Sequence, residues 1–491
     1  NAIVKEVEMF YVDSVETEKV VRRGIDAMLK GLDPYTEYYP EQETDNIKML
    51  VTGEYGGVGA YIRARDGGVI ISEPFEGMPA ALAGLKAGDR ILMIDTADVR
   101  KATTERVSEL LKGTPNSKVV IKIERPGEKK PRKVEVTRKQ VSLKQVVHYG
   151  VYGDGTGYIY LEGFKERSAD EVREALEDLK QNHHIKSLIL DLRDNGGGLL
   201  SSAVQIVNLF VPKGREVLST RGKMKLWDRT YRTTLDPVDS VIPLAVLING
   251  NSASASEIVS GALQDMDRAV LIGNRSFGKG LVQTPRDLPY EGQIKITTSK
   301  YYIPSGRCIQ KPYKKGDLKD YEMDLENRLR HGELIHPDSI HFSDSLKYYT
   351  LRRHRVVYGG GGIMPDCFVP LDTTRFTRFH RLLAAKNIII NAYLKYVDAN
   401  RQALKTQYRS FDAFNKTYGI PQSLLDAIVS EGKKEKIEPK DAAELKTTLP
   451  YLSHQLKALV ARDLWDMNEY FRVWNEQSDI VNKAVQLAAG K

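Results

Sequence analysis

A run of small residues near the middle of the chain contains three serines that suit acyl-transfer chemistry. Residues 252–256 read Ser-Ala-Ser-Ala-Ser, follow a tight turn at residues 249–251 and precede an apolar-periodic segment that predicts a helix. At a helix N-terminus the first backbone N–H groups have no intrahelical partner, and the helix dipole is positive there. Negative charge that develops during a reaction is therefore stabilised at this position, which suits a nucleophilic serine.

A serine hydroxyl is a weak nucleophile until a neighbouring base removes its proton, and Lys279 is the candidate base. It lies in the sequence Ser-Phe-Gly-Lys-Gly, on a turn between Gly278 and Gly280. Lysine acts as a base only when burial disfavours its ammonium form, and we expect the apolar residues Ile272 and Leu281 to contribute to that burial. The nine histidines offer no alternative, because none lies in a Gly-x-Ser-x-Gly elbow or a His-Glu-x-x-His zinc motif.

Two other interpretations use the same residues. Ser-Ala-Ser runs are common as helix caps, and on the serines alone a structural role is the better interpretation. Residues 273–279 imitate the phosphate loop Gly-x-x-x-x-Gly-Lys, and residues 187–191 imitate the acidic strand of an NTPase. The imitation fails because Gly280 stands where a Mg²⁺-binding serine or threonine is required. Residues 281–283 also predict a strand, whereas a phosphate loop opens a helix.

The complete pattern, Ser-Ala-Ser-Ala-Ser-Glu followed by Ser-Phe-Gly-Lys-Gly-Leu-Val-Gln, resembles the C-terminal processing (tail-specific) serine peptidases. The resemblance extends over most of the chain before the C-terminal region. In that family the middle serine is the nucleophile, the lysine is the general base, and a glutamine shortly after the lysine orients it. The resemblance therefore implies these roles for Ser254, Lys279 and Gln283, respectively.

A glycine turn resembles the oxyanion-hole turn of the same family. The strand predicted at residues 187–192 leads into Asn195 and three glycines. The resemblance implies that the backbone N–H groups of Gly197 and Ala255 hold the oxyanion of a tetrahedral intermediate. The family commonly has Asn-Pro-Gly-Gly, whereas this chain has Gly196 in place of the proline, so the choice among the glycine donors stays open.

Residues 53–140 predict a small β-rich module that resembles a PDZ domain. Residues 83–92 read Ala-Gly-Leu-Lys-Ala-Gly-Asp-Arg-Ile-Leu, which matches the most recognisable motif of that family. The resemblance assigns the carboxylate-binding loop to Gly57, Val58, Gly59 and Ala60. In such a loop successive backbone N–H groups point at the carboxylate of a chain end, while the bound peptide adds a strand to the sheet edge.

The predicted elements indicate a multidomain chain of the α/β and α+β classes. Residues 1–52 predict helices, which either help two subunits to dimerise, as the resemblance implies, or simply cap the core. Residues 141–371 alternate strands with helices and predict an α/β peptidase core with a mixed sheet and its chemistry at strand ends. Residues 314–347 are an insertion in that core. Residues 372–491 predict a helical C-terminal domain.

Composition narrows the possible partners. The net charge of +8 is spread along the chain, and the densest basic run, residues 129–133, predicts a hairpin turn rather than a nucleic-acid patch. No apolar run approaches the ~20 residues that span a bilayer. Cys308 and Cys367 cannot form a disulfide framework, and they either pair with each other or remain thiols. The motifs require no metal and no cofactor. The chain begins at Asn1 without a methionine, which indicates a missing targeting segment.

The sequence therefore predicts a serine endopeptidase that recognises protein C-terminal tails through a PDZ domain and cuts peptide bonds with a Ser-Lys dyad. Its expected partners are proteins or peptides with free or unstructured C-terminal tails, a second copy of the chain in a homodimer, and an activating partner or adaptor. The resemblance implies export to the bacterial periplasm or cell envelope. The alternative is a catalytically silent PDZ scaffold that binds C-termini.

Overall fold

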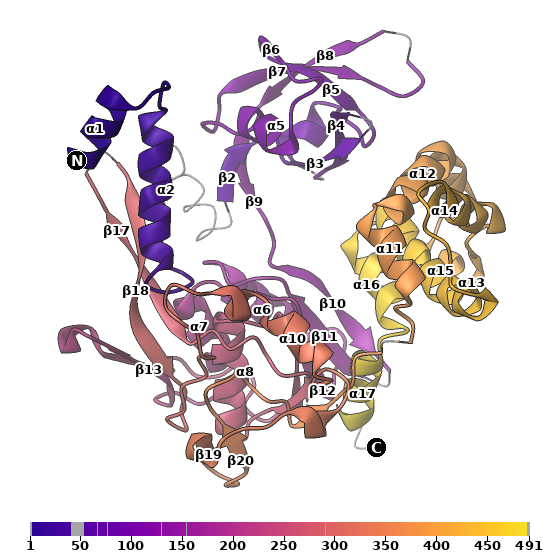
Figure 1. Cartoon of the computed structure of the whole chain (residues 1–491). Helices are drawn as coiled ribbons and strands as arrows, with labels where there is room; N and C mark the ends of the chain where they lie inside the picture. Colours follow the sequence, from indigo (N-terminus) through magenta and orange to yellow (C-terminus); the bar gives the residue numbers. More distant parts are fainter. Residues whose placement is uncertain are drawn as a thin grey trace. The chain divides into compact units, whose positions relative to one another are not determined.

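The structure, a computed structural model, describes residues 2–40, 54–65, 67–75, 77–128, 130–153, 155–289, 291–372 and 374–488. The chain divides into two compact units (Figure 1). The smaller unit is Asp45–Lys144, and the larger unit combines Asn1–Thr44 with Gln145–Lys491. Each unit has its own buried apolar core.

The smaller unit is built on a six-stranded antiparallel sheet in the order β3-β4-β5-β7-β8, with β6 paired to β5. Its strands are β3 (Ala60–Arg65), β4 (Gly68–Pro74), β5 (Arg90–Ile94), β6 (Ala97–Asp98), β7 (Lys118–Glu124) and β8 (Arg132–Thr137). Outside this sheet are the paired strands β2 (Glu54–Gly57) and β9 (Lys139–Ser142), and the helices α4 (Pro79–Leu82) and α5 (Thr104–Leu111). Alternate residues of β7, namely Val119, Ile121 and Ile123, are buried, as the strand period requires. The predicted β-rich module is therefore present.

The larger unit contains a central six-stranded sheet in the order β10-β11-β12-β15-β16-β21. β10 is antiparallel to β11 and all other neighbours are parallel, which confirms the predicted mixed sheet. The carboxyl ends of β12 and β15 therefore lie at one edge of the sheet, and the glycine turn and the serine run start from that edge. The strands are β10 (Val146–Tyr152), β11 (Thr156–Leu161), β12 (Ser187–Asp191), β15 (Leu244–Ile248), β16 (Val270–Gly273) and β21 (Cys367–Phe368).

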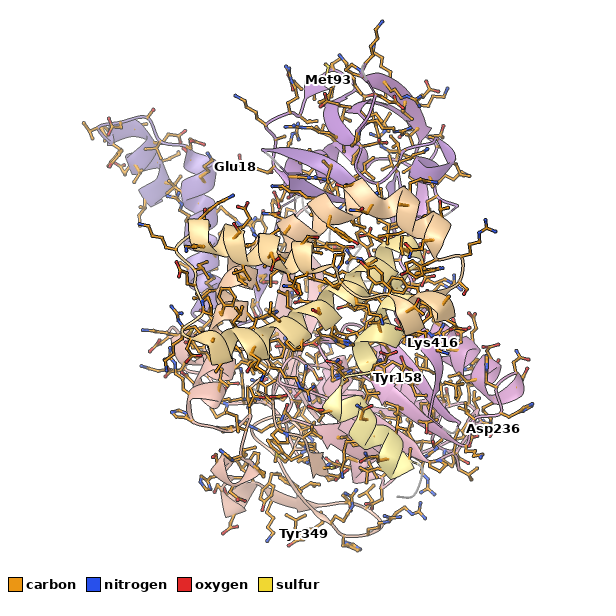
Figure 2. The ribbon with its side chains drawn as sticks, turned by 90° about the vertical axis from the view of Figure 1, so that its right-hand side faces the viewer. Glu18, Met93, Tyr158, Asp236, Tyr349 and Lys416 are labelled. Carbon is orange, nitrogen blue, oxygen red and sulfur yellow. The ribbon has the colours of Figure 1, made fainter. Side chains whose placement is uncertain are left out.

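Helices cover both faces of the central sheet. The main core joins one set of alternating strand residues to α6 (Ser168–Gln181), α7 (Leu200–Asn208) and α8 (Ala255–Asp265). The other set, which includes Tyr158, Ile189 and Leu247, packs against α17 (Asp479–Ala488). Tyr158 is labelled in Figure 2. The last described helix of the chain thus returns to the sheet that carries the catalytic motifs.

A second sheet of the larger unit follows the lysine turn. It runs in the order β1-β18-β13-β14, and β17 also pairs with β18. Its strands are β1 (Glu37–Tyr39), β13 (Glu216–Gly222), β14 (Arg229–Arg232), β17 (Leu281–Asp287) and β18 (Gln293–Tyr302). The strand at β17 agrees with the argument against a phosphate loop, which needs a helix at this point. The pairing of β1 with β18 brings the N-terminal segment to the strands that follow Lys279.

Helices form both ends of the chain, as expected. At the N-terminus lie α1 (Ala2–Phe10) and α2 (Thr17–Lys30). The C-terminal region has its own apolar core and contains α11 (Arg378–Ala385), α12 (Ile388–Gln407), α13 (Phe411–Thr417), α14 (Gln422–Lys434), α15 (Ala442–Leu464) and α16 (Met467–Asn475). The insertion contains two short helices, α9 (Lys319–Glu322) and α10 (Asp324–Arg330).

Cys308 and Cys367 are both free thiols. Of the helices that the structure describes, none combines the length and the apolar character needed to cross a membrane.

Candidate active site

Ser254 lies between β15 and α8 and is the residue that precedes the first turn of the helix. Its φ angle is +56°, a left-handed conformation that a non-glycine residue adopts only when its surroundings enforce it. Ser254 is partly exposed, whereas all eleven residues of α8 are buried. The chain therefore presents this hydroxyl at the N-terminus of a helix that is otherwise enclosed.

The two neighbouring serines have structural partners. The hydroxyl of Ser252 donates to the carbonyl of Leu192 at 2.7 Å, and the hydroxyl of Ser256 donates to the carbonyl of Asn195 at 2.8 Å. Both side chains are fully buried. Packing therefore accounts for Ser252 and Ser256, whereas Ser254, the N-cap residue of α8, is the partly exposed serine of the three.

Asn195 holds the glycine turn against the serine run. Its carbonyl accepts from the N–H of Ala253 at 3.1 Å, and its side-chain amide donates to the carbonyl of Leu161 at 2.8 Å. A Cβ atom on Gly197 would lie 2.8 Å from the Cβ of Ser254 and 2.9 Å from the nitrogen of Ala255, so the glycine turn packs directly against Ser254. Both expected oxyanion donors thus lie beside Ser254.

The N–H of Gly197 is engaged in this structure. It donates to Oδ1 of Asn195 at 2.9 Å. An oxyanion at this turn has to compete with that side-chain oxygen or use a neighbouring glycine N–H. The N–H of Ala255 belongs to the first turn of α8, where helix donors are available to a ligand.

Glu257 joins the serine to the lysine turn, an arrangement that we call the Glu257 clamp. Its Oε2 atom accepts from the N–H of Ser254 at 2.9 Å and from the N–H of Lys279 at 2.8 Å. Its Oε1 atom accepts from the N–H of Gly278 at 2.7 Å and from the hydroxyl of Ser276 at 2.5 Å. Complete burial raises the pKa of Glu257, and these four donors oppose that shift because they favour the ionised carboxylate.

Tyr301 of β18 adds a second bridge between the same two residues. Its hydroxyl donates to the carbonyl of Lys279 at 2.8 Å and to the carbonyl of Ser254 at 3.2 Å. The backbones of Ser254 and Lys279 are therefore tied together from both sides. Among the described residues, no hydrogen bond joins their side chains, and catalytic hydrogen bonds often form only once substrate is bound.

Lys279 is a partly buried lysine with an aromatic neighbour. Its Nζ atom lies 4.2 Å from the ring centroid of Tyr35. Burial, assisted by the positive charge of Lys295, lowers the pKa of Lys279 from its usual value near 10.5 to about 8. The two apolar residues expected to bury Lys279 lie in different places. Leu281 is buried at the start of β17, whereas Ile272 packs in the core that contacts α17. A lysine with this pKa is substantially neutral in mildly alkaline solution.

Gln283 lies on β17 and enters a network with the N-terminal segment. Its side-chain amide donates to the hydroxyl of Thr297 at 3.2 Å, and that hydroxyl donates to Oδ1 of Asp33 at 2.9 Å. Its predicted contact with Lys279 is not among the hydrogen bonds of the described residues. The orienting role of Gln283 stays a prediction.

In the smaller unit the predicted carboxylate-binding residues lie between β2 and β3. Gly57 ends β2, Ala60 begins β3, and the carbonyls of Val58 and Gly59 accept from Ala80 and Phe75. A pocket of about 210 Å³ lies beside them; it is lined by Tyr55, Val58, Ala60, Tyr61, Ile62, Phe75, Ser108, Leu111, Lys112 and Leu143. The pocket thus lies beside the loop that the sequence predicts to bind a chain-end carboxylate.

Several residues of the site escaped the sequence argument. Glu257 carried a local signal, because a glutamate three residues after a serine is the spacing of a capping box. Tyr35, Asp33, Thr297 and Tyr301 carried none. They reach the site only because β1 and β17 both pair with β18.

Comparison with known proteins identifies domains of the chain. The chain matches Peptidase family S41 over residues 155–321, a PDZ domain over residues 70–125, and a family of unknown function (DUF8443) over residues 379–466. It is 36% identical over 311 residues to a carboxy-terminal-processing protease of Bartonella bacilliformis, covering 63% of this chain and 71% of that protein.

Two further similarities have lower coverage or identity. The chain is 32% identical over 302 residues to a "Probable CtpA-like serine protease" of Staphylococcus aureus, covering 61% of this chain and 60% of that protein. A solved structure of a photosystem II D1 C-terminal processing protease is 29% identical and covers 62% of this chain and 83% of that one, with a TM-score of 0.35. On the sequence similarity to the Bartonella protein and the matched domains, the chain belongs to Peptidase family S41 and is a PDZ-containing serine protease of the carboxy-terminal-processing type.

Proposed function

We propose that this protease cuts peptide bonds with Ser254 as nucleophile and Lys279 as general base. The observation that carries the proposal is that Glu257 and Tyr301 each hydrogen-bond to the backbones of both Ser254 and Lys279. These bonds hold a strained, partly exposed serine next to a lysine whose pKa is lowered to about 8. A PDZ scaffold that only binds would need neither the strained serine nor a partly buried lysine with a lowered pKa.

The reaction proceeds through an acyl-enzyme. The neutral amine of Lys279 takes the proton of the Ser254 hydroxyl while Oγ attacks the carbonyl carbon of the substrate peptide bond. The resulting oxyanion is held by the N–H of Ala255 and by the turn at Gly197. The Lys279 ammonium then returns the proton to the leaving amine as the C–N bond breaks. Water, deprotonated by Lys279, attacks the acyl ester and releases Ser254.

The test compares three neighbouring serines. Ser254→Ala should lower kcat by at least about 10³-fold with an unchanged thermal midpoint, because only the nucleophile is lost. Ser252→Ala loses the hydrogen bonds of the hydroxyl with Leu192 and Asn249, and Ser256→Ala loses the one with Asn195. Both are controls that should keep substantial turnover, at a cost of ~1 kcal/mol in stability per lost bond. Cleavage of an unstructured protein, followed by mass spectrometry of the products, measures this. Retained turnover in Ser254→Ala would show that the nucleophile is elsewhere.

The pH dependence identifies the base. Because the base must be neutral, kcat/KM should rise about tenfold per pH unit below the pKa of Lys279 and level off above about pH 8. Lys279→Arg should be inactive over this range, since a guanidinium stays protonated. A kcat/KM profile that is flat from about pH 5 upward would show that Lys279 is not the general base. A rising limb near pH ~6.5 would instead indicate a histidine base.

We infer that the substrates are proteins with free or unstructured C-terminal tails, which bind through the loop at Gly57, Val58, Gly59 and Ala60. The pocket beside that loop and the PDZ match support this inference. From the membership of the carboxy-terminal-processing proteases we also propose that the enzyme is exported to the periplasm or cell envelope and that it has an activating partner or adaptor. Cell fractionation and co-purification from the native host test these two points.

We also propose that two copies of the chain form a dimer through the N-terminal helices α1 and α2. α1 buries none of its side chains, and Ile3, Phe10, Val12 and Met28 are 63–87% exposed. Such an apolar surface favours association. Light scattering after gel filtration should show a dimer that dissociates when Phe10 and Val12 are changed to serine.

A further inference from the structure

We propose that Tyr35, which comes from the N-terminal segment, is a positioning residue for the catalytic base: its ring forms the wall that separates the Lys279 amine from water. The inference rests on the proposed role of Lys279 and adds to it a residue outside the matched peptidase region, which begins at residue 155. The wall belongs to a segment that precedes the smaller unit in the chain. The base is therefore completed by a part of the protein far from it in sequence.

The contact between the ring and the amine is direct. The Nζ atom of Lys279 lies 4.2 Å from the centroid of the Tyr35 ring, within the distance at which a cation interacts with a π-system. Tyr35 is itself partly buried, and burial is the main reason that the pKa of its hydroxyl is raised. The ring therefore does not take part as an acid or base; it acts through the space it fills.

Tyr321 holds the outer end of the ring. The two hydroxyls form a short hydrogen bond, and the rings meet edge to face with centroids 6.0 Å apart. Tyr321 belongs to α9 and packs edge to face on Phe277, two residues before Lys279, with centroids 5.9 Å apart. The ring that covers the lysine is thus fastened to the turn that carries the lysine.

Asp33 holds the inner end of the segment. Its Oδ1 atom accepts from the N–H of Tyr35 at 2.8 Å and from the N–H of Thr36 at 3.0 Å, which forms a tight turn. The same atom accepts from the hydroxyl of Thr297 on β18, and the N–H of Thr297 donates to the hydroxyl of Thr36 at 3.1 Å. Gln283 donates to Thr297, so the glutamine expected near the base supports the wall that covers it.

The charges around Lys279 are few and partly cancel. Lys295 of β18 lowers the pKa of Lys279, whereas Glu37 of β1 and Glu257 of α8 raise it. Lys295 and Glu37 form an ion pair at 2.6 Å, which reduces the net effect of both. Exclusion of water is accordingly the largest influence on the amine, and Tyr35 is the side chain in direct ring contact with it.

The Tyr35 ring has two opposite effects on the pKa of Lys279, and substitutions of Tyr35 separate these effects. As apolar cover it disfavours the ammonium, and as a π-face it favours the ammonium by ~0.5–2 kcal/mol. Phenylalanine keeps both effects, leucine keeps only the cover, and alanine keeps neither and admits water. The pKa of Lys279 should therefore be highest with alanine, close to wild type with phenylalanine, and no higher than wild type with leucine.

The experiment measures the rate at which a fluorophosphonate reagent modifies Ser254, from about pH 6 to about pH 10, because this rate follows deprotonation of the base without peptide binding. In Tyr35→Ala the rising limb should move upward by at least about one pH unit. Tyr35→Phe should leave the limb in place, which separates the wall from the Tyr321 hydrogen bond. Tyr38→Ala is the matched control, because the Tyr38 ring in the same segment faces Arg22, 5.2 Å away.

The outcomes separate this inference from the proposed function. If the wild-type limb is missing, or persists in Lys279→Arg, then Lys279 is not the base and the proposed function fails. If the limb belongs to Lys279 but stays in place in a folded Tyr35→Ala protein, the wall is not Tyr35. An equal upward shift in Tyr35→Phe or Tyr38→Ala would also overturn it, because a general loosening of the segment would then explain the result. Circular dichroism and the thermal midpoint confirm that each variant is folded.

Discussion

Single buried side chains do most of the positioning in this active site. Glu257 and Tyr301 together contact the backbones of both proposed reactive residues. Ser254 keeps a left-handed φ because Glu257, Asn195 and the helix fix the chain on both sides of it. Strain of this kind persists only where the surroundings overdetermine the backbone.

Glu257→Gln tests the clamp. An amide has one acceptor oxygen, and its NH₂ group would face N–H donors, so the backbones of Ser254 and Lys279 should separate and kcat/KM should fall by about 10²-fold. Glu171→Gln is the matched control, because Glu171 also accepts two backbone N–H groups, from Gln145 and Val146, away from the site. Similar rate losses in both variants would mean that the effect is general destabilisation.

Gly197→Ala tests the glycine turn. The residue has φ +97°, and a Cβ atom would lie 2.6 Å from the carbonyl oxygen of Ala253 and 2.8 Å from the Cβ of Ser254. The turn should therefore move and kcat should fall by about 10²-fold or more, the effect of losing an oxyanion donor. Gly196→Ala has open space around its Cβ and should keep its activity. Steady-state kinetics that show equal losses in both variants would contradict this assignment.

We propose that different elements carry peptide binding and chemistry. The proposed nucleophile, Ser254, directly precedes α8 in the larger unit, whereas β3 and α5 border the pocket beside the predicted carboxylate-binding loop in the smaller unit. Because each unit has its own core, changes on α5 should alter substrate selection without altering bond cleavage.

Ser108→Trp tests this separation. Ser108 lines the pocket, and an indole there should fill it and raise the Kd of a tail peptide with a free carboxylate by at least about tenfold. Its neighbour Glu109 is exposed and does not line the pocket, so Glu109→Trp is the matched control. Fluorescence anisotropy in the Ser254→Ala background measures binding without turnover. Equal affinity for the free and the amidated peptide in wild type would exclude carboxylate recognition.

At the scale of the whole molecule, the C-terminal helices of the larger unit pack against its central sheet. His148 on β10 makes hydrogen bonds with Asn468 at 2.7 Å and with Tyr152 at 2.8 Å, and stacks on Phe471 with centroids 5.4 Å apart. Arg193, which follows β12 and leads to the glycine turn, donates to the hydroxyl of Ser478 at 3.3 Å. The C-terminal helices are thus attached to the reverse side of the sheet that supports the site.

This attachment should weaken in acid. Burial lowers the pKa of His148 to about 4, so between the usual histidine pKa of ~6.5 and about 4 the unfolded chain binds a proton that the folded chain excludes. Stability is therefore complete above about pH 6.5 and falls as the pH drops toward about 4, by up to ~3 kcal/mol. The thermal midpoint at about pH 7.5 and about pH 5 measures the change. His148→Phe keeps the stacking ring and should have the smaller difference; an equal difference would assign the acid sensitivity to other groups.

Local sequence was enough to predict the candidate reactive residues and most of the helices and strands. Small residues before an apolar-periodic segment identify the helix N-terminus at Ser254, glycines identify the turn at Lys279, and alternation identifies the strands. These signals work because helix starts, turns and strand periods depend on neighbours within a few residues. The same local rules excluded the phosphate loop, and β17 is indeed a strand.

The environment of those residues depended on tertiary structure. The pKa of Lys279 is set by which side chains exclude water from it, and Tyr35 and Lys295 reach it only through the pairing of β1 and β17 with β18. The choice of Asn195 Oδ1 as the partner of the Gly197 N–H likewise follows from how the turn packs on the serine run. Desolvation and hydrogen bonding act through space, between residues whose separation along the chain carries no signal. The sequence therefore predicted Ser254 and Lys279 as the dyad, and only the folded chain shows the surroundings that lower the pKa of Lys279.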